Sequence, residues 1–159
     1  MPIKEIKYKI SEYSEIRKVL EDIGAVQTKI LSVKDTYFEQ PTDKVLKLTQ
    51  DEEGCFLVRL EKNDSDEFVI IERKKLGSQD RNTTLANNKI ALSLRKKRIF
   101  YKIDGIGLNI NTIENIGDFL IFEYRNENQR QRIKELSPKL DLQDKDRIKV
   151  PFFKLAGRK

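Results

Sequence analysis

Charged and apolar residues alternate along the first stretch of the chain, residues 4–10. Glu5, Lys7 and Lys9 are separated by isoleucine and tyrosine, which is the period of two that a β-strand imposes on its side chains. Such a strand sends its charges to one face of a sheet and its large apolar groups to the other. A single strand of this kind is typical of a solvated edge, so its meaning depends on whether later strands repeat the pattern.

Seven further segments have the composition or the periodicity of strands, and turn residues separate most of them. These segments span residues 26–39, 45–49, 55–62, 67–75, 94–103, 108–113 and 118–125. An apolar stripe of helical period predicts an early helix over residues 14–23, and a polar run predicts a late one over 127–136. The stretch 76–88 has the composition of a loop, and a short helix is expected near residues 85–92.

Eight strands in meander-like order, with one helix early and one late, predict an α+β protein. Eight antiparallel strands can close into a tunnel whose interior holds side chains or one small ligand. We therefore expect a closed or nearly closed eight-stranded antiparallel β tunnel with helices packed outside it. Neither an internal repeat nor a linker divides the sequence, so we expect one domain over residues 1–159.

The composition narrows the chemistry that the chain can perform. A net charge of +6 favours anionic partners in general. The chain has no histidine, which leaves carboxylates, lysine, arginine and tyrosine for any catalysis. A single cysteine, Cys55, excludes an internal disulfide, and no apolar run reaches the length of a membrane span, so a cytoplasmic protein without a membrane segment is expected. The sequence leaves a dimer open.

Long cations recur on the later strands. Arg59 and Arg73 follow apolar runs, Lys96 and Arg98 share one face of their strand, and Glu123 shares a face with apolar neighbours. In an open sheet these residues would form a solvated face, whereas in a closed tunnel they would line the interior. Two like charges about 4 Å apart repel by roughly 4 kcal/mol at an effective dielectric near 20. A tunnel of such groups would therefore attract a polyanion, and arginine and lysine suit phosphate best.

Three stretches resemble the CYTH family, the class IV adenylate cyclase and thiamine triphosphatase group of triphosphate tunnel enzymes. Residues 5–9 are similar to the family's N-terminal Glu-x-Glu-x-Lys signature. Residues 35–38, with the hairpin that ends at Arg59, are similar to its Asp-x-Tyr-Phe and Leu-Arg-x-Arg elements. Residues 96–101, followed by 111–123, are similar to its Lys-x-Arg strand and its closing acidic strand.

The resemblance covers residues 3–125 and leaves a C-terminal helix and tail over 126–159. It implies an antiparallel tunnel that binds a triphosphate or related organic phosphate through lysine and arginine, while carboxylates hold Mg²⁺ or Mn²⁺. The expected phosphate-binding residues are Lys7, Lys9, Arg59, Arg73, Lys96 and Arg98, and the expected metal ligands are Glu5 and Glu123.

Four positions depart from the family pattern. Lys7 stands at the second glutamate of the signature, Leu57 at the first arginine of its element, Asn111 at an aspartate, and Ile121 at the first glutamate of the closing pair. The loss of three acids and the gain of one cation change the interior charge by about +4, which repels a metal ion and attracts an anion directly. Metal-dependent catalysis of the family type is therefore expected to be impaired.

Three functions remain open from the sequence. The leading one is a tunnel protein that binds a phosphate-bearing small molecule or polyphosphate with little or no metal. The second is an active divalent-metal-dependent triphosphatase or adenylate cyclase, which would use Glu5 and Glu123 with Glu72 or Glu114 as substitute ligands. The third is a basic RNA- or protein-interaction module. Nucleic acid is the least favoured partner, because the chain lacks the aromatic and glycine signature of RNA-binding modules.

Overall fold

The computed structural model describes residues 2–156, which form nine strands and four α-helices. The strands are β1 (Lys4–Ile10), β2 (Val26–Phe38), β3 (Lys44–Asp51), β4 (Gly54–Lys62), β5 (Phe68–Leu76), β6 (Ile90–Ile103), β7 (Ile106–Ile113), β8 (Gly117–Tyr124) and β9 (Arg147–Ile148). The helices are α1 (Tyr13–Asp22), α2 (Ser78–Asn87), α3 (Glu127–Lys139) and α4 (Phe152–Leu155). Within the described part of the chain, each helix is too short or too polar to cross a membrane.

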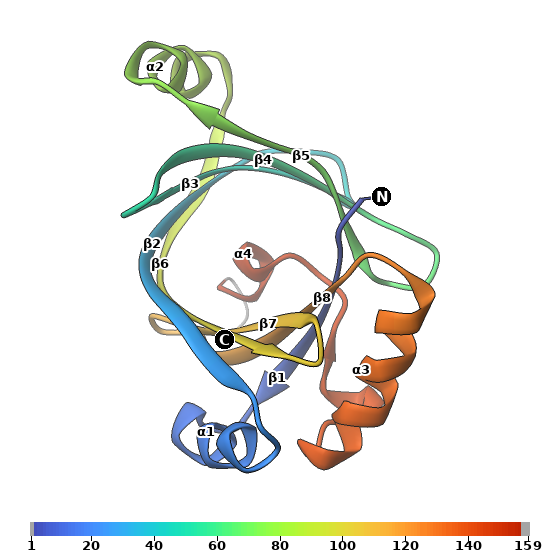
Figure 1. The fold of residues 1–159 in the computed structure, drawn as a ribbon. Coiled ribbons are helices and arrows are strands. Elements are labelled where there is room, and N and C mark those ends of the chain that lie inside the picture. Colours follow the sequence, from blue (N-terminus) through green and yellow to red (C-terminus); the bar gives the residue numbers. More distant parts are fainter. Residues whose placement is uncertain (1, 157–159) are drawn as a thin grey trace.

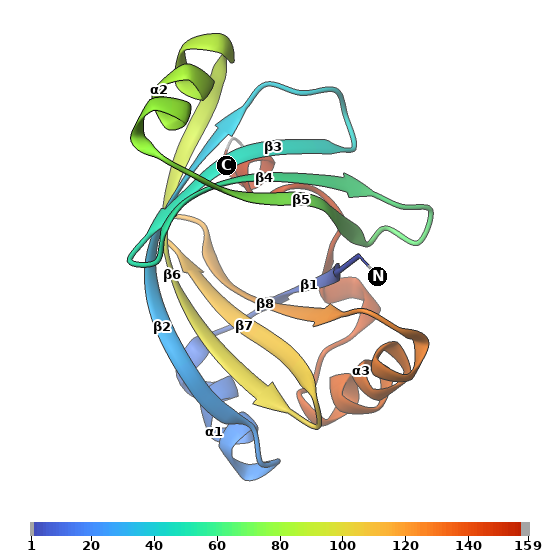
Figure 2. The same cartoon turned by 45° about the horizontal axis from the view of Figure 1, so that its top comes forward.

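The first eight strands form a closed antiparallel barrel. Their order around the barrel is β5-β4-β3-β2-β6-β7-β8-β1, and β1 pairs back with β5, so that Lys4 lies opposite Val69 and Glu5 opposite Phe68. Figures 1 and 2 show the ring of strands with α1 and α3 outside one wall and α2 beyond the opposite one. The predicted α+β fold with a closed eight-stranded antiparallel tunnel is confirmed. Residues 1 and 157–159 of the expected domain lie outside the described residues.

Alternation along the strands gives the barrel two apolar layers. Outward residues of β1, such as Ile6 and Tyr8, join outward residues of β6, β7 and β8 in a cluster that α1 and α3 cover. Inward residues of nearly all the barrel strands form a second cluster inside the barrel, in which Phe68, Phe119 and Ile121 are buried. One face of each strand therefore faces the tunnel, and the other holds the helices in place.

Helix α2 lies where the sequence predicted a loop, and the helix expected near residues 85–92 is wrong, because β6 begins within that range. The hydroxyl groups of Thr83 and Thr84 donate to backbone carbonyls one turn earlier, at 3.0 and 2.8 Å. These bonds satisfy polar side chains that usually favour turns. Leu85 packs against a small buried cluster outside the barrel, which contains Phe38, Leu46 and Leu48.

The C-terminal segment returns to the barrel and ends in its opening. Strand β9 pairs with β1, so that Arg147 lies opposite Tyr8 and Ile148 opposite Lys7. Pro151 then turns the chain into α4, which Figure 1 shows within the ring of strands. Phe152 and Phe153 of α4 belong to the inner apolar cluster. The last apolar residues of the sequence thus pack in the tunnel.

Candidate functional site

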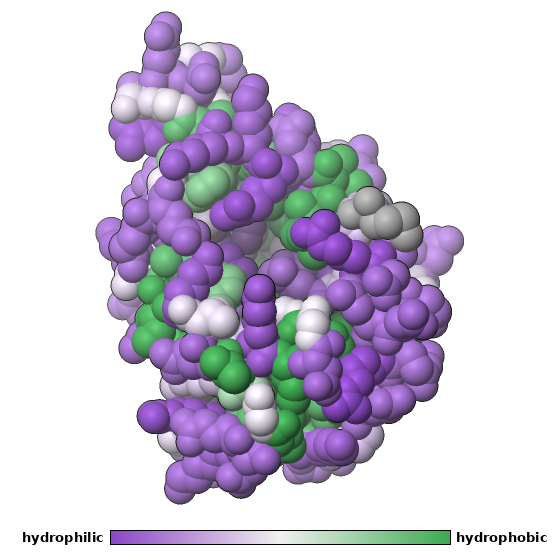
Figure 3. Space-filling model, viewed as in Figure 1, coloured by the Kyte–Doolittle hydropathy of each residue, from purple (hydrophilic) through white to green (hydrophobic). Residues whose placement is uncertain are grey.

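A cavity of about 240 Å³ occupies the barrel interior, and most of its wall is built from alternate residues of the strands. Figure 3 shows a hollow in the face that looks into the barrel in Figure 1. The polar and charged residues that line the cavity are Glu5, Lys7, Lys29, Lys47, Thr49, Asp51, Glu53, Arg73, Lys96, Arg98 and Glu123. Six cations and four acids therefore surround one small space.

Asp35 is buried behind the cavity wall, between the wall residues Lys47 and Lys96. Its side chain is fully buried, and its Oδ2 lies 2.7 Å from Lys96 Nζ and 3.2 Å from Lys47 Nζ. Thr49 Oγ1 donates to the other carboxylate oxygen at 2.6 Å. Burial favours the neutral acid, but the ammonium groups of Lys47 and Lys96 outweigh it and hold the pKa of Asp35 well below its usual range. One carboxylate thus holds two lysines in the wall.

Lys7 projects from β1 toward the same space, and its ammonium group lies 4.3 Å from the ring centres of both Phe68 and Phe152. Its residue is buried, and within residues 2–156 no carboxylate lies within salt-bridge distance of its nitrogen. Two aromatic faces can stabilise a cation through their quadrupoles, but they do not neutralise it. Lys7 is therefore a buried cation without an acidic partner at the cavity wall.

The surroundings change the protonation of these lysines. Burial lowers the pKa of Lys7 to about 8, although the nearby Glu5 opposes the shift. Burial also lowers the pKa of Lys96 to about 7, although Asp35 opposes it. Both ammonium groups thus hold their protons less tightly than in water, and a bound anion would strengthen that hold.

A second polar group continues along the wall from Lys96, on strands β6, β7 and β8. Arg98 donates to Asn109 Oδ1 from Nε and Nη2, at 3.4 and 3.3 Å, and its Nη2 lies 4.0 Å from Glu123 Oε1. Glu123 is the cross-strand partner of Glu5. Burial, and then the charge of Glu5, raise the pKa of Glu123. Asn111 donates to Asn109 at 2.6 Å, and its own side-chain oxygen is buried and accepts no hydrogen bond from the described residues.

Arg73 marks the mouth of the cavity. It lines the cavity, but its residue is exposed, and its guanidinium carbon lies 4.0 Å from the ring centre of Phe56. Lys29 and Glu53 are paired at 3.0 Å at the same cavity, and both side chains are about two-fifths exposed. The cavity is therefore open to solvent on this side.

Arg59 does not lie in the tunnel, so its expected place in the charged interior is wrong. Val58 and Leu60 line the cavity, and the residue between them points outward because side chains alternate along a strand. Arg59 is half-exposed, with its Nε 3.9 Å from Glu72 Oε1. The apolar neighbours of Arg59 in the sequence suggested an interior position, whereas the alternation of side chains along β4 puts Arg59 on the outer surface.

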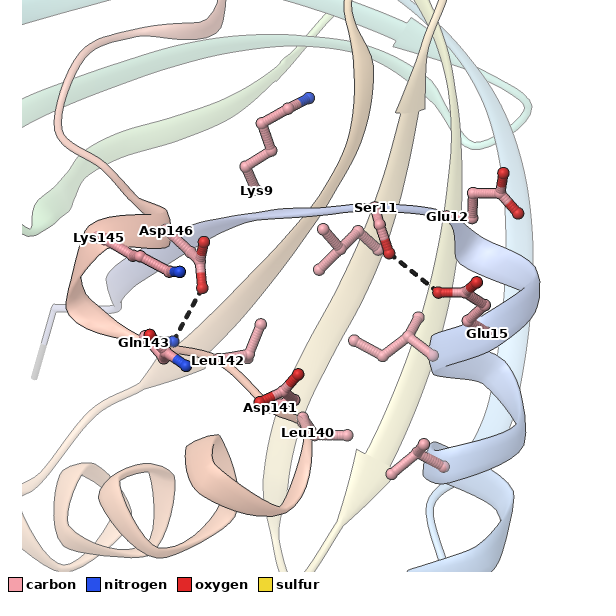
Figure 4. Close-up of a pocket in the computed structure, with 13 residues that line it drawn as sticks. Lys9, Ser11, Glu12, Glu15, Leu140, Asp141, Leu142, Gln143, Lys145 and Asp146 are labelled. Carbon is pink, nitrogen blue, oxygen red and sulfur yellow. Dashed lines mark hydrogen bonds between the residues drawn. The ribbon is translucent and has the colours of Figure 1, made fainter.

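Lys9 shares the inward face of β1 but does not line the cavity that contains Lys7. Its ammonium group lies 5.0 Å from the ring centre of Phe119. It borders a different pocket of about 410 Å³, between α1 and the segment that follows α3. Figure 4 shows its nitrogen pointing away from Glu15 and Asp146 in that pocket. Lys7, Arg73, Lys96 and Arg98 are therefore brought together, and Lys9 is separated from them.

Sequence reasoning missed several parts of the site. Asp35 was recognised only as part of a motif, and Lys47, Thr49 and Asn109 were not selected. Lys47 alternates with Leu46 and Leu48 on β3, so strand parity was a usable signal for it. Phe152 carried no such signal, because nothing in the sequence connects the C-terminal segment to the tunnel interior.

No protein-family model matches the chain, and no curated protein matches it. Several solved structures match the chain. A conserved hypothetical protein from Pyrococcus furiosus is 26% identical, over 96% of this chain and 99% of that one, with a TM-score of 0.84. A proposed adenylate cyclase from Vibrio parahaemolyticus is 14% identical, over 98% of each chain, with a TM-score of 0.76. A proposed adenylyl cyclase from Hippeastrum, described as having a dominant triphosphatase activity, is 14% identical over 87% of this chain and 88% of that one, with a TM-score of 0.65. At 14% identity the likeness concerns the fold, and the tunnel architecture is shared.

Proposed function

We propose that the protein binds a triphosphate, or another phosphate-bearing anion, in its tunnel through lysine and arginine, and that it does so without a resident metal ion. The observation that carries this proposal is Lys7, a buried cation at the cavity wall without a carboxylate partner among the described residues. Lys96, Lys47 and Arg98 line the same cavity. Phosphate oxygens supply the negative charge and the acceptors that these groups need.

The carboxylates of the cavity do not fit a resident Mg²⁺ or Mn²⁺ site. Glu5 and Glu123 are cross-strand partners, but Lys7 follows on the same face of β1 and the Arg98 guanidinium lies near Glu123. Burial raises the pKa of Glu123, which favours the neutral acid over the carboxylate that a metal needs. Among the described residues, no three acidic or cysteine side chains gather as a metal-binding group. The anion is therefore expected to contact the cationic side chains directly.

Isothermal titration calorimetry with tripolyphosphate, ATP and thiamine phosphates, each with Mg²⁺ and with EDTA, tests the proposal. We expect at least one of these anions to bind in EDTA. Lys7→Met removes one charge-assisted contact, which is worth about 1.5–3 kcal/mol, so binding should weaken by about 10- to 100-fold.

Lys9→Met is the matched control, because Lys9 is on the same face of the same strand but outside the cavity. We expect it to change binding by less than about threefold. Binding that requires Mg²⁺, or phosphate release from tripolyphosphate that disappears in Glu5→Gln, would instead indicate a metal-dependent enzyme. Absence of binding by all of these anions would contradict the proposed function.

A further inference from the structure

We propose that Phe152 closes one end of the tunnel and so limits the length of the phosphate chain that the tunnel accepts. The proposal rests on the proposed function, since it concerns the specificity of the same cavity. The proposal also gives a role to the C-terminal segment, whose position inside the barrel is not explained by the charged residues of the strands.

The ring of Phe152 lies at the point where the cationic side chains converge. The residue is 1% exposed and lines the cavity. Its ring centre lies 4.3 Å from Lys7 Nζ and 5.5 Å from Lys96 Nζ. On another side it packs against Phe119, with 4.9 Å between the ring centres. An apolar side chain thus occupies space next to the two ammonium groups.

The Phe119–Phe152 pair divides the row of charges on β1. Glu5 and Lys7 line the cavity, whereas Lys9 lies beside Phe119 and borders the outer pocket of Figure 4. Lys7 and Lys9 point to one face of the strand, and together they would form a continuous cationic track for an extended polyanion. In this structure, an anion that enters near Arg73 meets Lys7 and is stopped before Lys9.

The size of the cavity agrees with a short ligand. Its volume of about 240 Å³ is below the roughly 300–1,000 Å³ of pockets that bury a drug-sized molecule. A few linked phosphate groups fit such a space. To continue from Lys7 toward Lys9, a long chain would have to pass the place that the Phe152 ring occupies.

Contacts on both sides of Phe152 hold it in position. Before it, β9 pairs with β1 directly opposite Lys7, and Arg147 donates to the carbonyl of Asp66 at 3.1 Å. After it, Phe153 packs against Tyr37 with 4.9 Å between the ring centres. The end wall is therefore tied to the strand that carries Lys7 and to the opposite side of the barrel.

The test compares the binding of tripolyphosphate and of a long-chain polyphosphate by the full chain. In the unchanged protein, we expect the long chain to bind no more than about threefold more tightly than tripolyphosphate. Phe152→Ala removes the ring and lengthens the cavity beyond Lys7, so the preference for the long chain should rise at least tenfold. Phe38→Ala is the matched control, since it removes an equally buried phenylalanine from the cluster outside the barrel, and the preference should stay within about twofold.

Labelling of lysines by reductive methylation, followed by mass spectrometry, tests the end wall without any anion. Removal of the ring opens a second route to Lys7 besides the mouth near Arg73, so we expect Lys7 to be labelled faster in Phe152→Ala than in the unchanged protein and in Phe38→Ala. If no anion binds the unchanged protein, the proposed function fails, and the labelling still decides whether Phe152 closes the tunnel.

The proposal is overturned if folded Phe152→Ala keeps the original preference for chain length, or if Lys7 is labelled at the same rate in that variant and in the unchanged protein. It is equally overturned if the unchanged protein already binds the long chain at least tenfold more tightly. Should Phe152→Ala fail to fold, Phe152→Val provides the comparison, because it also removes the ring while keeping an apolar contact. An unchanged preference for chain length in Phe152→Val would also overturn the proposal.

Discussion

Residues of one type have different roles in this tunnel because of what lies next to them. Lys7 and Lys9 are two positions apart on β1 and face the same way, but Lys7 lies between two aromatic rings and Lys9 borders another pocket. Lys96 is held by Asp35, whereas Arg59 faces outward. The formal charge of a residue therefore says little about its role until its neighbours are known.

Asp35→Asn should strongly destabilise the protein. The substitution keeps the size of the side chain but removes the charge between Lys96 and Lys47, which leaves two buried ammonium groups without their partner. Breaking a buried ion pair in this way costs about 3–5 kcal/mol. Urea denaturation at neutral pH measures the loss as a fall in the free energy of unfolding.

Asp43→Asn is the control for this substitution. Asp43 lies 3.2 Å from Lys62, but its side chain is 61% exposed, so the same change should cost less than about 1 kcal/mol. Equal losses for the two variants would show that Asp35 does not organise the cationic wall.

Strand periodicity predicts which residues face the tunnel, but only when the alternation of side chains is followed residue by residue along each strand. It placed Lys7, Lys96 and Arg98 on inward faces, and the structure has them at the cavity. Arg59 shows the opposite case, since apolar residues on both sides suggested an interior position that the alternation excludes. The separation of Lys9 could not be predicted, because it depends on aromatic side chains from β8 and α4.

At the scale of elements, α3 is fixed to the barrel through a buried carboxylate. Glu67 is 2% exposed and accepts hydrogen bonds from the Tyr124 hydroxyl and from Arg130 Nε, the latter at 3.0 Å. Burial, and the hydrogen bond to Glu67, raise the pKa of Tyr124 to about 12. The loop before β5, strand β8 and helix α3 therefore meet at one acid.

Arg130→Ala should destabilise the attachment of α3. It leaves Glu67 buried with Tyr124 as its remaining partner, and the loss of a hydrogen bond to a buried charge should cost roughly 2–3 kcal/mol. Arg132→Ala, two residues further on the same helix, removes pairs with Asp104 and Glu135, whose side chains are about half exposed. It should cost less than about 1 kcal/mol. Thermal or urea unfolding compares the two, and a larger loss for Arg132→Ala would contradict the assignment.

Strands were easier to predict than helices in this chain because their signal repeats every two residues. The eight barrel strands lie close to their predicted positions, for example β4 at Gly54–Lys62 against an expected 55–62. Helix α2 was missed because its apolar contact depends mainly on Leu85 and its polar side chains are satisfied within the helix. Helix α4 has four residues and obtains its contacts from the barrel, which the local sequence does not contain.

For the whole molecule, the burial of cations connects stability to anion binding. Lys7 and Lys96 have lowered pKa values in the folded protein, about 8 and about 7, against 10.5 for the ordinary side chain. The unfolded chain therefore holds more protons than the folded one between about pH 7 and pH 10. Since stability rises with pH wherever the unfolded state binds more protons, the unliganded protein should become more stable as pH increases.

From pH 7 to about pH 8.5, the free energy of unfolding should increase by about 2 kcal/mol, because one pKa unit corresponds to about 1.4 kcal/mol. This window ends below 9.0, the ordinary pKa of a thiol such as Cys55, whose own pKa is raised by burial and would act in the opposite direction at higher pH. Urea denaturation across the window measures the effect, and Lys7→Met should reduce the slope. Saturating tripolyphosphate should reverse the trend, because the anion binds the protonated lysines and is released as they lose their protons. A stability that falls with pH in the unliganded protein would show that these lysines are not buried cations in solution.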